Sequence, residues 1–152
     1  MVIIGDHHGA HKVLQNAIKN KHIENETFIH VGDFGTGFTK LSNEMGQIDL
    51  WNKFLIEGVD IVITHSCPNF VAPVVVKNNW PYIVNQFLPN DPTLESMLVK
   101  ERKEIGDMCN LLRKKNDIRY WFYGHFHQSE VTHNGPTLFR MLGINELYEH
   151  RT

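Results

Sequence analysis

Short, continuous apolar runs recur along the chain, and longer stretches with helical spacing of apolar residues lie between them. The runs are rich in β-branched and aromatic residues and cover residues 2–4, 27–31, 59–63 and 118–123. Continuous apolar character, without alternation, is typical of strands that are buried on both faces. Helical periodicity predicts helices over residues 11–21, 50–57 and 92–115. Strands that alternate with helices indicate an α/β domain.

The second half of the chain adds a few further predictions. The long helix has Asp91 as its N-cap candidate, and Gly106 inside it weakens the prediction that it is continuous. Its charged stretches, residues 100–103 and 113–115, are expected on a solvated helix face. A strand is predicted over residues 137–142, after a turn at residues 134–136. The proline-rich stretch 69–92 fits either a loop or lid over a site or a surface excursion.

Each of the four apolar runs ends in a polar cluster that contains side chains of metal-ligand type. In α/β folds, ligands gather outside the carboxyl ends of the strands, so the clusters are expected to converge. Residues two apart on an extended segment point to the same side, which pairs the ligands within a cluster. The candidate ligands are Asp6 and His8 after the first run, Asp33 after the second, His65 after the third, and His125 and His127 after the fourth.

Each cluster taken alone also has an ordinary structural explanation. Asp6 fits as the cap of the helix that begins near His11, Asp33 as a turn residue, and His65 as a hydrogen-bonded histidine at a strand end. The combination favours metal, because carboxylates and imidazoles together suit Mn, Fe or Zn. A lone catalytic zinc needs only about three protein ligands. The larger set therefore predicts a two-metal site, in which ions about 3.5–4 Å apart activate a bridging water for attack on phosphorus.

Length, net charge and the lack of long apolar runs limit the classes of partner that the protein is expected to bind. A length of 152 residues fits a single domain over residues 1–152, and a formal charge of −2 disfavours nucleic acid or an anionic membrane bound through bulk charge. Bound cations would still attract a phosphorylated substrate. No apolar run approaches the ~20 residues of a membrane helix. The N-terminus lacks the basic region of a signal peptide, so a cytoplasmic location is expected.

The cysteines and the remaining histidines are expected to have structural rather than catalytic roles. Cys67 and Cys109 have no metal-site spacing and are expected to be idle thiols in a reducing compartment. The chain has no Gly-x-Ser-x-Gly motif and no P-loop, which disfavours a serine hydrolase or a P-loop kinase. Surface or hydrogen-bonded positions are expected for the histidines without a partner at ligand spacing, which are His7, His11, His22, His30, His133 and His150.

In order and type, the clusters resemble the motifs of the calcineurin-like metallophosphoesterase family, from residue 3 to about residue 143. The matching segments are Gly5-Asp6-His7-His8-Gly9, Gly32-Asp33, Thr64-His65 and Gly124-His125-Phe126-His127. The resemblance implies a two-sheet β-sandwich flanked by helices. It also implies a role for each ligand: Asp6, His8 and His127 on one metal, Asp33 as the bridge, and His65 and His125 on the second metal.

One family motif is missing. Between Asp33 and His65 the family carries Gly-Asn-His-Asp/Glu at the end of another strand, and the interval here has no such sequence. In the family, that asparagine binds the second metal, and the histidine protonates the leaving group or binds phosphate. Asn43 and Asn52 are poor substitutes. The short interval suggests that a strand–helix–strand block has been lost, and no catalytic acid is assigned.

The sequence thus predicts a metal-dependent phosphoesterase that hydrolyses a phosphate ester with a metal-activated water. Two divalent ions are expected, with Mn favoured and the second site lacking its asparagine. The substrate would be a phosphorylated small molecule, a nucleotide or a phosphoprotein. The alternative is a truncated, catalytically weak or inactive homologue that acts by binding or has no activity of its own.

Overall fold

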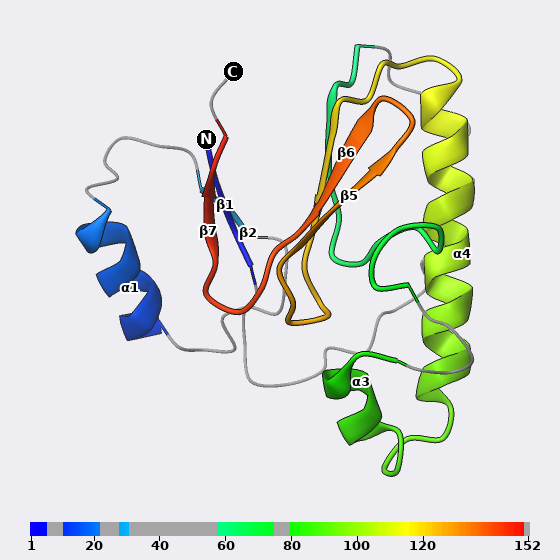
Figure 1. The fold of residues 1–152 in the computed structure, drawn as a ribbon, viewed down its shortest axis with the longest axis horizontal. Helices are drawn as coiled ribbons and strands as arrows, with labels where there is room; N and C mark the ends of the chain where they lie inside the picture. Colours follow the sequence, from blue (N-terminus) through cyan, green and yellow to red (C-terminus); the bar gives the residue numbers. More distant parts are fainter. Residues whose placement is uncertain (6–10, 22–27, 31–57, 75–79, 151–152) are drawn as a thin grey trace.

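The computed structural model of the 152-residue chain describes residues 1–5, 11–21, 28–30, 58–74 and 80–150. Helices and two β-sheets make up this part of the protein (Figure 1). The elements are β1 (Val2–Ile4), α1 (His11–Asn20), β2 (Phe28–His30), β3 (Ile61–Ile63), α3 (Tyr82–Phe87), α4 (Leu94–Arg113), β4 (Tyr120–Tyr123), β5 (Glu130–Asn134), β6 (Thr137–Met141) and β7 (Leu147–Glu149).

The strands form one sheet in the order β2-β1-β7 and another in the order β3-β4-β6-β5. β1 and β2 are parallel, and β7 runs antiparallel to β1. In the other sheet β3, β4 and β6 are parallel, and β5 is antiparallel to β6. All four strands predicted from the apolar runs therefore lie in parallel pairs. The predicted α/β class with two sheets is confirmed.

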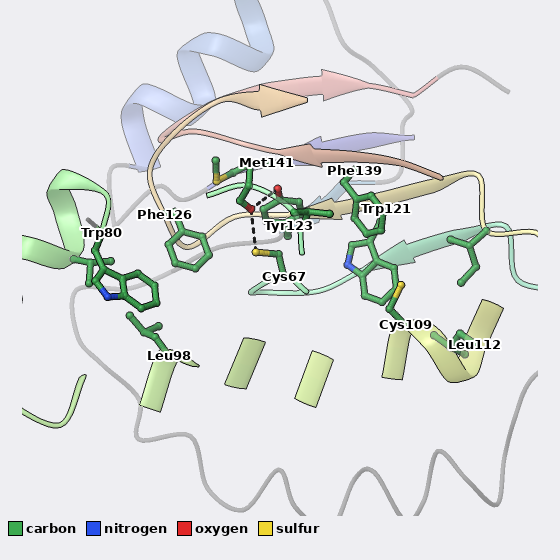
Figure 2. Packing of buried hydrophobic residues seen from close by; sticks show 14 residues of the cluster. Cys67, Trp80, Leu98, Cys109, Leu112, Trp121, Tyr123, Phe126, Phe139 and Met141 are labelled. Carbon is green, nitrogen blue, oxygen red and sulfur yellow. Dashed lines mark hydrogen bonds between the residues drawn. The ribbon is translucent and has the colours of Figure 1, made fainter. Parts of the chain in front are cut away.

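Alternating residues of β4 face opposite layers of the fold. Phe122 packs between the sheets against Ile3 of β1 and Leu142, which follows β6. Trp121 and Tyr123 point the other way, into the cluster that α4 covers (Figure 2). Because both faces of the strand are buried, its sequence is apolar throughout.

The small sheet is covered in the same way by α1. Val2 of β1 and Leu147 of β7 pack against Ala17 and Ile18 of that helix. The layers therefore follow the order α1, β2-β1-β7, β3-β4-β6-β5, α4, and Figure 1 shows the two helices on opposite outer faces. The expected arrangement of two sheets between helices is present in the described residues.

Gly106 does not interrupt α4, which runs unbroken from Leu94 to Arg113. A Cβ at Gly106 would lie 2.7 Å from the Oδ1 atom of Asn69, so the glycine gives the segment after β3 room to lie on the helix. Asp91 is not the cap itself. Its Oδ1 atom accepts hydrogen bonds from the backbone amide and hydroxyl of Thr93, just before the helix begins.

Three elements differ from the sequence predictions or add to them. Helix α3 lies within the stretch expected to be irregular, and β5 and β7 were not predicted. β5 escapes a hydrophobicity pattern because all of its residues except Val131 are polar, and every one of them is exposed or half-buried. The predicted turn is confirmed, with Gly135 at φ +60° between β5 and β6. The helix expected over residues 50–57, and the interval of the missing block, lie outside the described residues.

Candidate metal site

The carboxyl ends of β3, β4 and β6 lie side by side. Hydrogen bonding between β3 and β4 continues past the strands, because the Gly124 amide donates to the His65 carbonyl at 3.0 Å. On the other side of β4, the Leu142 amide donates to the Tyr123 carbonyl at 2.8 Å. The segments that follow these three strands therefore start from adjacent positions, as the sequence predicted for two of them.

The end of β1 reaches the same place from the other sheet. The Gly5 amide donates to the Glu146 carbonyl at 2.9 Å. A Cβ at Gly5 would lie 2.0 Å from the Gly143 carbonyl oxygen, so only glycine allows this approach. The chain thus leaves β1, immediately before Asp6, beside the segment that follows β6.

His65 and His125 are brought together by this arrangement. Their ring centroids are 4.5 Å apart and the rings meet edge to face, at 61°. Both residues are half-buried. His65 is preceded by Thr64, whose hydroxyl accepts a hydrogen bond of 2.8 Å from the Trp121 indole and donates one to the Ser66 carbonyl. The buried tryptophan therefore fixes the backbone from which His65 projects.

The sequence suggested that His125 and His127 continue β4 in an extended conformation, but the structure shows that they do not. β4 ends at Tyr123, and the two histidines have φ values of 71° and 56°. The Phe126 amide donates to the Gly124 carbonyl at 2.9 Å, which closes a γ-turn around His125. Such turns with positive φ are rare and strained. The fully buried Phe126 explains the turn, because its ring must enter the core beneath.

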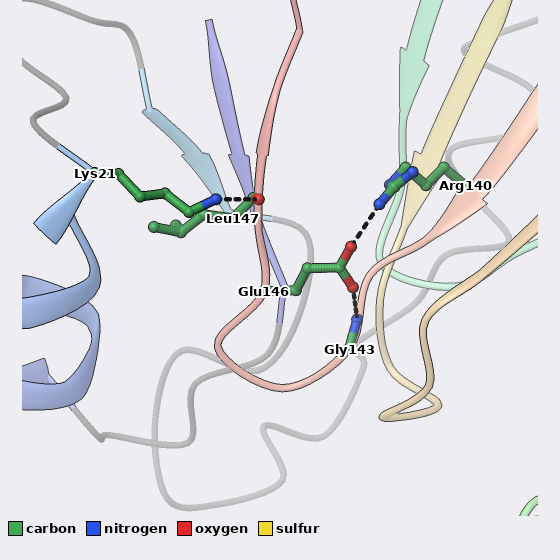
Figure 3. A network of polar contacts seen from close by, with 5 residues as sticks. All are labelled: Lys21, Arg140, Gly143, Glu146 and Leu147. Atoms are coloured by element: carbon green, nitrogen blue, oxygen red, sulfur yellow. Dashed lines mark hydrogen bonds and ion pairs between the residues drawn. The ribbon is translucent and has the colours of Figure 1, made fainter.

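A carboxylate with several partners organises the loop after β6 (Figure 3). The Glu146 side chain accepts 2.8 Å hydrogen bonds from the Arg140 guanidinium and from the Gly143 amide. Burial raises the pKa of Glu146, but hydrogen bonds from Gly143, Arg140 and Ser129 outweigh it, and the pKa lies below its ordinary value. Since its own carbonyl receives the Gly5 amide, Glu146 joins the ends of β1 and β6. The sequence reasoning missed this residue.

Buried arginines are the second feature that the sequence reasoning missed. Residues 100–103 and 113–115 were predicted to form a solvated face, which is wrong for Arg102, only 4% exposed, and for Arg113, which is half-buried. Both guanidinium groups lie over aromatic rings, Arg102 over Phe126 and Arg113 over Phe139. A helix pattern that treats every arginine as exposed cannot detect this.

Both cysteines are buried, and His133 has the surface position that was expected, whereas His150 is buried. Burial raises the pKa of Cys67 to about 12 and that of Cys109 to about 11, so both thiols stay protonated at neutral pH. His133 is exposed on β5. His150 is buried, and its ring lies 4.6 Å from that of Tyr120.

Half of the predicted metal ligands belong to the described part of the chain. His65 and His125 are in contact, and His127 lies on the same loop as His125. Asp6, His8 and Asp33 lie outside the described residues, as do Asn43 and Asn52. Within the described ranges, no group of three or more histidine, cysteine, aspartate or glutamate side chains is placed to hold a metal ion. A site would therefore need ligands from the segments that follow β1 and β2.

Among the described helices, none has the length and apolar character needed to cross a membrane.

No protein-family model matches the chain, and comparisons with curated proteins and with solved structures also find no match.

Proposed function

We propose that the protein is a metal-dependent phosphoesterase of the calcineurin-like type. The observation that carries the proposal is the contact between His65 and His125, whose rings meet 4.5 Å apart where β3 and β4 end. These residues come from two separate sequence motifs that are 60 positions apart. Imidazole is a common ligand for Mn, Fe and Zn, so two imidazoles in contact support a shared metal site.

Backbone geometry gives independent support. Residues other than glycine seldom adopt positive φ, and strained positions cluster where a site needs them. His125 and His127 both have positive φ, in the segment that carries the most specific motif. Glycine would occupy these positions without strain, so the presence of histidine at both supports a role for the imidazoles.

In this proposal His65 and His125 hold the second metal, while Asp6, His8 and His127 hold the first, with Asp33 between them. When bound, divalent ions would activate a water for attack on a phosphate ester. The protein's part is to hold the imidazoles and orient the ester. Mn is the favoured ion, and the substrate is a phosphorylated small molecule, nucleotide or phosphoprotein.

The test is metal content and phosphate release from an aryl phosphate ester, after the metal-free protein is supplied with Mn²⁺, Fe²⁺ or Zn²⁺ in turn. We expect turnover with Mn²⁺, and its loss in His65→Ala, His125→Ala and Asp33→Asn. His133→Ala is the matched control, because that histidine is exposed on β5. Activity that survives all three site variants, or that needs no metal, would overturn the proposal.

A second candidate is a metal-binding homologue without turnover. The missing Gly-Asn-His-Asp/Glu motif favours it, since that motif supplies a ligand and a proton donor in the family. The same experiment separates the two candidates. Metal that binds through His65 and His125, without phosphate release, supports the binding protein.

A further inference from the structure

Arg102 is a buried charge that contacts both histidine-bearing loops. It lies on α4 and is 4% exposed. Its Nη2 atom donates hydrogen bonds to the Pro68 carbonyl at 3.2 Å and to the Val71 carbonyl at 2.8 Å. Its guanidinium carbon lies 5.5 Å from the centre of the Phe126 ring. Burial of a charge is costly unless such partners are present, so these contacts hold the side chain in one place.

The contacts reach the two loops from one side. Pro68 and Val71 belong to the segment that leaves β3 through His65, whereas Phe126 separates His125 from His127. The main chain at Arg102 adds a further link, since its carbonyl accepts a hydrogen bond of 3.1 Å from the Asn69 amide. One residue of α4 therefore fixes the position of both loops relative to the same helix.

The geometry requires the particular shape of arginine. A guanidinium is planar, so its edge donates in the plane to carbonyl groups while its face covers an aromatic ring. A lysine ammonium is a compact point charge on a flexible stem and cannot do both at once. Replacing Arg102 with lysine keeps the charge but loosens one loop or the other.

We propose that Arg102 is a positioning residue that sets the approach of His65 to His125. Its effect on metal binding and turnover rests on the proposed function, but its effect on the imidazole pair does not. Outer partners that orient metal ligands typically change metal affinity by about 10–100-fold when they are mutated.

The chain supplies a matched control on the same helix. Arg113 also donates to a backbone carbonyl, that of Asn134 at 2.7 Å, and its guanidinium carbon lies 5.3 Å from the centre of the Phe139 ring. Its hydrogen bonds reach the β5–β6 turn rather than the histidine loops, and its guanidinium carbon also lies 5.8 Å from the centre of the Phe70 ring in the segment after β3. Arg113→Lys therefore removes a similar set of contacts on the same helix while it keeps every hydrogen bond of Arg102 and the contact of Arg102 with Phe126.

The first measurement uses the assigned ring signals of His65 and His125 in the NMR spectrum of the metal-free full chain. We expect these signals to shift or broaden in Arg102→Lys, and to change less in Arg113→Lys. Unchanged signals in Arg102→Lys, or equal changes in both variants, would overturn the proposal. Because no metal is present, this result is independent of the proposed function.

The second measurement is Mn²⁺ affinity and the kinetics of aryl phosphate hydrolysis. We expect Arg102→Lys to weaken Mn²⁺ binding by about 10–100-fold and to lower kcat more than it raises KM. Arg113→Lys should leave both quantities near the wild-type values. Equal losses in the two variants would reduce Arg102 to a general structural role. Absence of Mn²⁺, Fe²⁺ and Zn²⁺ binding in the wild type would instead reject the proposed function and leave the imidazole result standing.

If Arg102→Lys does not fold, Arg102→Gln provides a second test. Glutamine keeps a side-chain amide that can donate to a backbone carbonyl, and it removes the charged, planar guanidinium that lies over the Phe126 ring. We expect the ring signals of His65 and His125 to change more in this variant than in Arg113→Gln. Signals identical to those of the wild type, or equal changes in the two variants, would overturn the proposal.

Discussion

Gly5 and Gly143 approach so closely that a Cβ on Gly5 would lie 2.0 Å from the Gly143 carbonyl oxygen. This contact joins the end of β1 to the segment after β6, and thus joins the two sheets at the edge where the histidines gather. It also fixes the point from which the chain continues to Asp6. The atoms nearest to such a Cβ are backbone atoms of Gly143 and Leu142, so no side-chain movement can relieve the clash.

Gly5→Ala is expected to destabilise the protein and to weaken metal binding together. Overpacking of this kind typically costs about 1–3 kcal/mol. The control is Gly135→Ala, because Gly135 has φ +60° and a Cβ added there would meet no atom of the described residues within 4 Å beyond its chain neighbours. Left-handed strain alone costs about 1–2 kcal/mol there. Urea unfolding and Mn²⁺ titration of both variants check the prediction. Metal affinity that falls equally in both would contradict it.

At His125, glycine should be a more stable replacement than alanine. The φ of 71° suits glycine, whereas alanine keeps a Cβ and with it a left-handed penalty of about 1–2 kcal/mol. On β5 the order should reverse, because glycine in a strand interior is less stable than alanine by about 0.5–1 kcal/mol. Urea unfolding of the Gly and Ala variants at positions 125 and 133 compares the two sites. The same order at both positions would argue against a strained loop.

The Glu146 carboxylate is expected to add stability at neutral pH that disappears in acid. Its folded pKa lies below the ordinary value of 4.5, so the unfolded chain binds the proton more tightly. The contribution is therefore complete above pH 4.5 and is lost as pH falls through the lower, folded value. Hydrogen bonds to a charged group contribute about 1.5–3 kcal/mol, with the low end expected here because the side chain is partly exposed.

Glu146→Gln isolates this contribution. The variant should be less stable than the wild type at neutral pH, and the gap should close as the pH falls below 4.5. Glu95→Gln makes a useful comparison, since Glu95 is a half-buried hydrogen-bonded acid on α4, away from the loop after β6. Thermal unfolding over a pH series gives the answer. A gap for Glu146→Gln that stays constant with pH would contradict the assignment.

Sequence patterns located the strands that precede the candidate ligands, because strands buried on both faces leave a continuous apolar run. They also placed the polar clusters at strand ends, where His65 and His125 do meet. They failed where a distant contact decides the local conformation. The turn at His125 depends on the burial of Phe126, and the burial of Arg102 depends on carbonyls 34 and 31 positions away. Helical periodicity carries no information on such partners.

Thr64 offers a direct test of how the backbone at His65 is held. Its hydroxyl accepts the Trp121 indole hydrogen at 2.8 Å and donates to the Ser66 carbonyl. Thr64→Val keeps the shape but leaves the indole of a fully buried tryptophan without this partner, which should cost about 1–3 kcal/mol. Thr64→Ser retains the hydroxyl and should cost less. Urea unfolding followed by tryptophan fluorescence, with the ring signals of His65 as a second readout, compares the variants. If valine is tolerated as well as serine, the Thr64 hydroxyl does not hold this strand end.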